Sequence, residues 1–115
     1  KFPLFSGSQK HLRSFTYVGD IIEGLLSAVK KHHELNGEII NLGTEAEYTT
    51  QEGIDYVEEL LGKKIELEVK PRRKGDQWHT RANINKAKKI LDYHPTTTLK
   101  DGLQRQINWY KANFL

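Results

Sequence analysis

Residues 70–86 read KPRRKGDQWHTRANINK and contain the densest positive charge in the chain. Four of the five residues from Lys70 to Lys74 are cations, and Gly75 and Asp76 place a carboxylate directly after this run. Arginine suits phosphate because its planar guanidinium donates two parallel hydrogen bonds. The segment therefore indicates a binding site for an anion that also carries hydroxyl groups, although a solvated basic turn gives the same pattern.

The composition limits the classes to which the protein can belong. A chain of 115 residues forms one domain or part of one, and its 37% hydrophobic content is low enough that some of the surface is expected to face a partner. The net charge of +3 is a mild excess, and much of it lies between Lys70 and Lys89. This distribution favours a local anion site over a nucleic-acid-binding face along the whole domain.

Several absences narrow the choice further. The chain has no Cys, which excludes disulfides and thiolate metal sites and favours a reducing compartment. No apolar run is long enough to span a membrane and no signal-peptide pattern occurs, so we expect a cytoplasmic protein without a membrane partner. Because the chain begins at Lys1 and contains no Met, we expect it to be a piece of a longer protein.

The first half of the chain predicts a strand, a helix and a second strand. Residues 1–13 are turn-rich and are expected to form an entry loop, and the β-branched and aromatic residues 14–18 predict a short strand. A helix over 19–33 then carries the apolar stripe Ile21, Ile22, Leu25, Leu26 and Val29. Residues 38–43 are apolar without alternation, which predicts a strand buried on both faces.

The second half predicts three helices and one strand. Thr49 and Glu52 form a capping-box pattern before a helix over 50–61, which Gly62 ends. Residues 65–70 alternate as a half-exposed strand, Asn83 can cap a short helix over 84–91, and Thr98 with Asp101 opens a final helix. The order of elements predicts an α/β fold with a small mixed or parallel sheet.

Most fingerprints of a self-sufficient enzyme are missing. Neither GxGxxG nor GxxxxGK[ST] occurs, and there is no GxSxG motif and no Cys nucleophile. His32 and His33 are adjacent and would point apart on a helix, so we predict no metal site, and His79 is expected to pack or to face solvent. Arg13 and Arg73 remain, both at expected strand ends, where open α/β folds bind ligands. Together with Asp76 they could clamp a diphosphate and hydrogen-bond a ribose.

An ordered set of motifs resembles the extended short-chain dehydrogenases, the NAD-dependent sugar-nucleotide epimerases and dehydratases. Residues 13–20, RSFTYVGD, resemble the R-x-F-x-Y-V-x-D segment of that family, and residues 37–43, GEIINLG, resemble its G-x-x-x-N-x-G strand. Residues 73–76, RKGD, are similar to its R-x-G-D, and residues 82–87 to its A-D-x-x-K-A. Residues 91–110 are similar to its L-G-Y-x-P…L-x-x-G-L…W-Y ending. The UDP-glucose 4-epimerase type is the most similar.

This resemblance implies that residues 1–115 are the carboxy-terminal, substrate-binding portion of a Rossmann-type enzyme with NAD as cofactor. The matching arginines of the family bind the diphosphate of a UDP- or dTDP-sugar, which implies that role for Arg13 and Arg73. The matching aspartate takes a ribose hydroxyl, which implies that role for Asp76. Ser14, Asn83 and Asp92 depart from the family pattern and affect the expected loop geometry.

The resemblance also implies which partners the chain needs. The glycine-rich cofactor loop and the catalytic Tyr-x-x-x-Lys pair of the family are absent. The chain alone is therefore expected to be inactive and to hold no catalytic or cofactor-binding residue. Its expected partners are the nucleotide-sugar substrate, an amino-terminal NAD-binding domain of the same protein, and a second copy, either as a homodimer or through self-association.

Three alternatives stay open at this point. The parent enzyme could be a dehydratase or a decarboxylase of the same family instead of a 4-epimerase. The basic run 70–74 could instead belong to a nucleic-acid-binding module, although Asp76 and the acidic residues Glu58, Glu59, Glu66 and Glu68 interrupt any continuous basic face. The chain could also be an interaction segment that binds no ligand.

Overall fold

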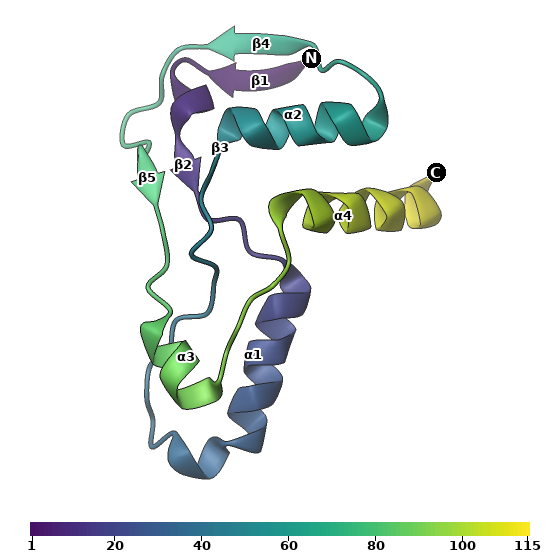
Figure 1. The fold of residues 1–115 in the computed structure, drawn as a ribbon. Coiled ribbons are helices and arrows are strands. Elements are labelled where there is room, and N and C mark those ends of the chain that lie inside the picture. The colour runs from purple at the N-terminus through teal and green to yellow at the C-terminus, as the bar shows by residue number, and fades with distance from the viewer.

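Two stretches that are distant in sequence, residues 2–13 and 67–80, run side by side in the computed structural model, which describes residues 1–115 (Figure 1). Strand β1 (Phe2–Phe5) pairs in parallel with β4 (Leu67–Lys70). Strand β2 (Leu12–Arg13) pairs in parallel with β5 (His79–Thr80) and antiparallel with β3 (Tyr48–Thr49). The chain therefore builds one parallel and one mixed sheet, both small, as the order of elements predicts.

Four α-helices and two short 3-10 turns complete the fold. The helices are α1 (Val18–Lys30), α2 (Thr50–Leu61), α3 (Asn85–Leu91) and α4 (Leu99–Phe114), and the turns are η1 (Ser8–Lys10) and η2 (His32–Glu34). In Figure 1, α2 lies beside β1 and β4, whereas α1 and α3 lie together at the opposite end. None of these helices combines the length and the apolar character needed to cross a membrane.

The helix α2 begins and ends where its sequence predicts. The Oγ1 of Thr49 accepts a hydrogen bond from the backbone N–H of Glu52 at 3.1 Å, and the Glu52 carboxylate accepts one from the backbone N–H of Thr49 at 2.6 Å. These two bonds form the predicted capping box. Gly62 ends the helix with φ 64°, a conformation that glycine adopts without steric cost.

The helix α1 begins one residue earlier than expected and is tied to a distant loop. Its first turn has no side-chain cap, and the buried Asp20 carboxylate instead accepts hydrogen bonds from the backbone N–H groups of Thr96 and Thr97 at 3.4 and 3.2 Å. Asp20 therefore joins α1 to the connection between α3 and α4. The helix α3 begins at Asn85, one residue later than predicted, and Ile84, not Asn83, is its N-cap residue. The Oδ1 of Asn83 still accepts a 3.1 Å hydrogen bond from the N–H of Asn85.

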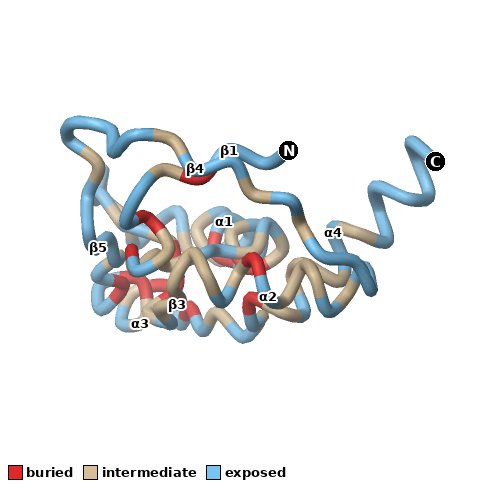
Figure 2. Tube along the Cα trace, turned by 90° about the horizontal axis from the view of Figure 1, so that it is seen from above, coloured by how far each residue is buried: buried red, intermediate tan, exposed pale blue.

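The hydrophobic core is small because the molecule is thin. The chain extends only 19 Å along its shortest axis, and 13 of 115 residues are buried. The main cluster joins Ile84, Ala87, Leu91 and Tyr93, and Figure 2 shows buried residues gathered near α3. The hydroxyl of Tyr93 donates to the backbone carbonyl of Gly43 at 2.9 Å, and burial raises the pKa of this phenol.

Three predictions about strands are wrong, for one physical reason. Residues 38–43 are not a strand, and Ile39 is 84% exposed, because no other strand of this chain lies within hydrogen-bonding reach. Residues 14–17 form a connection and not a strand, since the pairing with β5 ends at Arg13. Residues 1–13 are not only a loop, because β1 and β2 find partners far along the chain.

Candidate functional site

The pairing of the strands brings the two predicted arginines to one place. Between the paired positions Phe5–Lys70 and Leu12–His79, the chain has residues 6–11 on one side and 71–78 on the other. The second connection is two residues longer, turns at Gly75 with φ 78° and contains Arg73 and Asp76. Arg13 lies on β2, next to the end of this connection.

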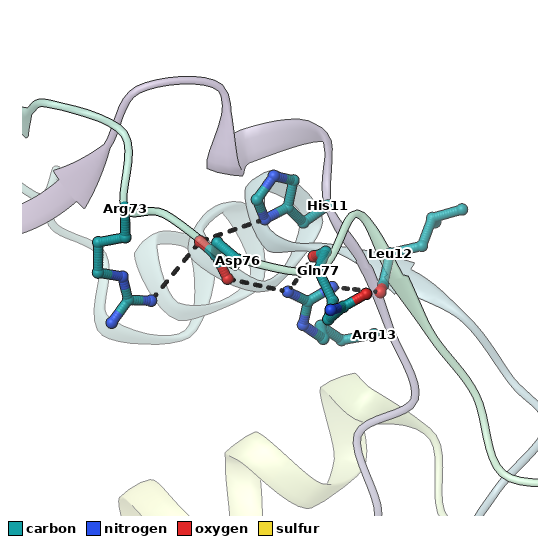
Figure 3. A network of polar contacts seen from close by, with 6 residues as sticks. All are labelled: His11, Leu12, Arg13, Arg73, Asp76 and Gln77. Carbon is teal, nitrogen blue, oxygen red and sulfur yellow. Dashed lines mark hydrogen bonds and ion pairs between the residues drawn. The ribbon is translucent and has the colours of Figure 1, made fainter.

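The carboxylate of Asp76 lies at the centre of the site, between three basic side chains (Figure 3). Its Oδ1 is 3.5 Å from Nη2 of Arg13, and its Oδ2 is 3.6 Å from both Nη2 of Arg73 and Nδ1 of His11. Arg13 and Asp76 are 63 residues apart in sequence. The structure therefore brings together all three residues that the sequence predicts for the site, and adds His11 to them.

The two arginines differ in how firmly they are held. Arg13 donates to the backbone carbonyls of Leu12 and Gln77 at 2.8 and 2.5 Å, and its side chain is 25% exposed. Arg73 is 60% exposed, and its guanidinium lies 4.1 Å above the ring of Phe5. Its single long contact with Asp76 leaves most of its five donors for another anion. The site combines one fixed guanidinium with one that can turn.

The predicted set does not include His11, whose side chain is 3% exposed. Its ring meets Trp78 edge-on, with 4.9 Å between the centroids. A signal for it exists in the sequence: residues 11 and 13 are two apart, and on extended backbone such residues share a face. His79, which the sequence draws attention to, lies outside the network and pairs with Glu47 on the surface.

The remaining basic residues of 70–74 do not form a continuous positive face. The guanidinium of Arg72 lies 4.4 Å above the ring of Trp78, and Lys70 pairs with Glu68 at 3.3 Å. Arg73 turns toward Asp76. No group of three or more His, Asp or Glu side chains in the chain is arranged to hold a metal ion.

A hollow of about 560 Å³ lies apart from the Asp76 network, between the segment after Arg13 and the helix α4. It is open and mostly apolar, with walls that include Phe15, Tyr17, Leu103 and Trp109. The guanidinium of Arg105 lies 5.2 Å above the ring of Tyr17 at this place. The sequence does not predict this groove, because its two walls are far apart along the chain.

Comparison with known protein families shows the family to which the chain belongs. The model of the GDP-mannose 4,6 dehydratase family matches residues 1–106. The chain belongs to this family. The predicted resemblance to the extended short-chain dehydrogenases with epimerase or dehydratase activity is therefore confirmed.

Individual relatives agree with this assignment. The UDP-glucuronate 4-epimerase of Thermodesulfobacterium geofontis is 38% identical over 93% of this chain and 32% of its own length. UDP-glucuronic acid decarboxylase 1 of Arabidopsis thaliana is 32% identical over 95% of this chain and 24% of its own length. The chain thus spans about a quarter to a third of the length of these relatives.

A solved structure gives the same result for the fold. The UDP-glucuronic acid 4-epimerase from Bacillus cereus, in complex with UDP-glucuronic acid and NAD, superposes with a TM-score of 0.87. The two sequences are 30% identical, and the match covers 97% of this chain and 35% of that one. The predicted fold class, an α/β portion of a Rossmann-type epimerase with small mixed sheets and helices, is confirmed.

Proposed function

We propose that this chain binds the nucleoside diphosphate of a UDP- or dTDP-sugar as part of an NAD-dependent sugar-nucleotide 4-epimerase. Arg13 and Arg73 hold the diphosphate, and Asp76 accepts a hydrogen bond from a ribose hydroxyl. The observation that carries this proposal is the convergence of both guanidiniums on one carboxylate, within 3.5 and 3.6 Å. Two arginines against one carboxylate leave a local excess of one positive charge, which suits a diphosphate.

The difference between the two arginines suggests how the ligand is taken up. Arg13 is held by two backbone carbonyls, so it presents a guanidinium whose orientation is set before the ligand arrives. Arg73 is exposed and loosely paired, so it can exchange Asp76 for a phosphate oxygen. Asp76 then loses a cationic partner and becomes free to accept a hydrogen bond from the ribose.

The cofactor and the chemical step are proposed to lie outside this chain. The solved structure of the Bacillus cereus epimerase contains NAD. The residues of this chain do not fit NAD, because no glycine-rich turn joins a parallel strand to a helix here and no Tyr-x-x-x-Lys pair occurs. We therefore assign neither NAD binding nor catalysis to these residues, and the chain alone is expected to be inactive.

An NAD-binding portion of the same protein is the proposed partner of the exposed apolar surface. Five apolar side chains of α1 are between 48% and 68% exposed: Val18, Ile22, Leu25, Leu26 and Val29. Ile39 is 84% exposed, within an extended segment that has no strand partner in this chain. Surfaces of this kind mark an interface, and an unpaired extended segment can join the edge of another sheet.

Dehydratase and decarboxylase activities remain alternatives within the same proposal. The matching family model and the Arabidopsis thaliana relative bear those names. A diphosphate clamp serves all three reactions, so the residues described here support the ligand class and not the choice of reaction. A nucleic-acid-binding role has less support, because Lys70 and Arg73 are paired with carboxylates and Arg72 lies on Trp78.

Replacing Arg73 tests the proposal in the whole protein that carries this chain. Arg73→Ala is expected to weaken UDP binding, measured by titration calorimetry, by about 2–4 kcal/mol, the scale of losing a charge-assisted contact with the diphosphate. Arg13→Ala should act in the same direction. Arg72→Ala is the matched control and should have a smaller effect, because that guanidinium lies on Trp78. Unchanged UDP affinity in Arg73→Ala would contradict the proposed function.

A further inference from the structure

One side chain of the Asp76 network faces the interior of the protein and not the solvent. His11 is 2% exposed, and its Nδ1 is 3.6 Å from Oδ2 of Asp76. Its other ring nitrogen, Nε2, is buried and has no hydrogen-bond partner. Buried polar atoms nearly always have a hydrogen-bond partner, so a buried histidine with one unpaired nitrogen calls for a physical explanation.

The contact with Asp76 selects one tautomer of this histidine. A neutral imidazole carries its proton on either Nδ1 or Nε2. A bare Nδ1 would turn its lone pair toward a carboxylate oxygen, which is repulsive, so the proton belongs on Nδ1. His11 therefore directs an N–H donor at Oδ2 of Asp76 from behind, while both arginines approach the carboxylate from more exposed positions.

Neighbouring elements hold the His11 ring and backbone in place. The backbone carbonyl of His11 accepts a 3.1 Å hydrogen bond from the N–H of Thr50 at the start of α2, and its own N–H donates to Ser8 at 3.0 Å. The edge-on contact with Trp78 supports the ring, and the guanidinium of Arg72 lies over Trp78 in turn. His11 is a fixed donor, unlike the exposed Arg73.

We propose that His11 is a positioning residue that holds the Asp76 carboxylate while Arg73 turns to a diphosphate. In the free protein three basic side chains share this carboxylate, and a bound diphosphate competes for two of them. His11 is the partner for which the diphosphate does not compete, and it keeps Asp76 in place for the ribose hydroxyl. This inference rests on the proposed function, since it assigns how Asp76 stays oriented in that site.

Substitutions of His11 in the whole protein test the inference through UDP affinity. His11→Leu removes the imidazole that faces Asp76 and is expected to weaken UDP binding roughly tenfold, the scale of losing one polar contact to a charged group. His11→Asn places an amide N–H near the position of Nδ1 and should restore most of the affinity. His11→Gln carries the same amide one carbon farther out and should not restore the affinity.

A double-mutant cycle separates positioning from a general structural role. On an Asp76→Asn background, His11→Leu should cause no further loss of UDP affinity, because the carboxylate on which His11 acts has been removed. A loss of equal size on both backgrounds would overturn the inference. Thermal unfolding without UDP identifies any variant that does not fold. If His11→Leu does not fold, the comparison of His11→Asn with His11→Gln tests the inference instead. Equal UDP affinities of those two variants would also overturn the inference.

The two proposals can fail separately. If Arg73→Ala and Asp76→Asn both leave UDP affinity unchanged, the proposed function itself is wrong. If those two variants weaken UDP binding and His11→Leu does not, the proposed function is supported and the positioning role of His11 is rejected.

Discussion

The helices α1 and α2 have nearly equal lengths, 13 and 12 residues, but they use their apolar residues in opposite ways. The helix α2 has a complete capping box and a buried Ile54, and its neighbours η1, β3 and α4 all belong to this chain. The helix α1 has no side-chain cap at its N-terminus. Most of its large apolar side chains are about half exposed or more.

The buried face of α1 explains this difference. Gly24 is buried, and a Cβ atom at this position would lie 2.8 Å from Leu42 and 3.2 Å from Tyr93. The helix therefore approaches the rest of the chain through a small residue, and its large side chains face away. The comparison teaches that most apolar residues of α2 are covered within these 115 residues, whereas α1 leaves a second apolar face exposed.

The largest expected effect concerns α2, the helix whose apolar residues are mostly covered within this chain. Ile54→Ala in α2 should lower the free energy of unfolding by about 2–4 kcal/mol, because it leaves a cavity in a packed site. Leu26→Ala in α1 should lower it by less than about 1 kcal/mol in the same chain, because that side chain is 48% exposed. Urea unfolding of both variants measures the difference. Equal losses would mean that the outer face of α1 is covered within the chain.

The next largest effect concerns the exposed apolar face of α1. We expect the 115-residue chain on its own to self-associate through α1, because its exposed leucines can be covered by a second copy. Replacing both Leu25 and Leu26 with Glu should raise the dissociation constant at least tenfold, or about 1.4 kcal/mol, in light scattering over a concentration series. Leu61→Glu is the matched control, an exposed leucine on α2 that should leave association unchanged. A wild-type chain that stays monomeric at high concentration would contradict this prediction.

The smallest expected effect concerns the N-terminal cap, which α2 has and α1 lacks. Hydrogen bonds from the backbone and the side chain of Thr49 hold the pKa of Glu52 below its ordinary value. Because the folded-state pKa is the lower one, the stabilisation is present above the unfolded-state pKa and is lost as the pH falls through the folded-state pKa. The difference in unfolding free energy between wild type and Glu52→Gln should therefore shrink on going from pH 7 to pH 3.

A matched control for the pH experiment lies on α1. Glu23 is exposed and its carboxylate makes no hydrogen bond, so Glu23→Gln removes a carboxylate of α1 without removing a cap. If both variants behave alike over this range, the capping box is not the source of the pH dependence.

The candidate site could be predicted in part. Arg13, Arg73 and Asp76 lie in recognisable motifs, and the structure brings these three side chains together. Their binding roles stay predictions. His11 is not marked by any motif, since its importance depends on burial and on contact with Asp76 and Trp78, which are distant in sequence. Motif reading identifies residues that meet a ligand more readily than residues that support them from behind.

The sequence by itself determined the helices and the strand β4, which lies within the predicted range 65–70, and only the tertiary structure decided the other strands. The start and end of α2 and the Thr98 cap of α4 were predictable because caps and helical hydrogen bonds join residues only a few positions apart. The strand expected over 38–43 did not form, and β1 formed where a loop was expected, because a strand exists only when a partner supplies its hydrogen bonds. That partner is set by the packing of the whole chain, and the same packing brings His11 behind Asp76.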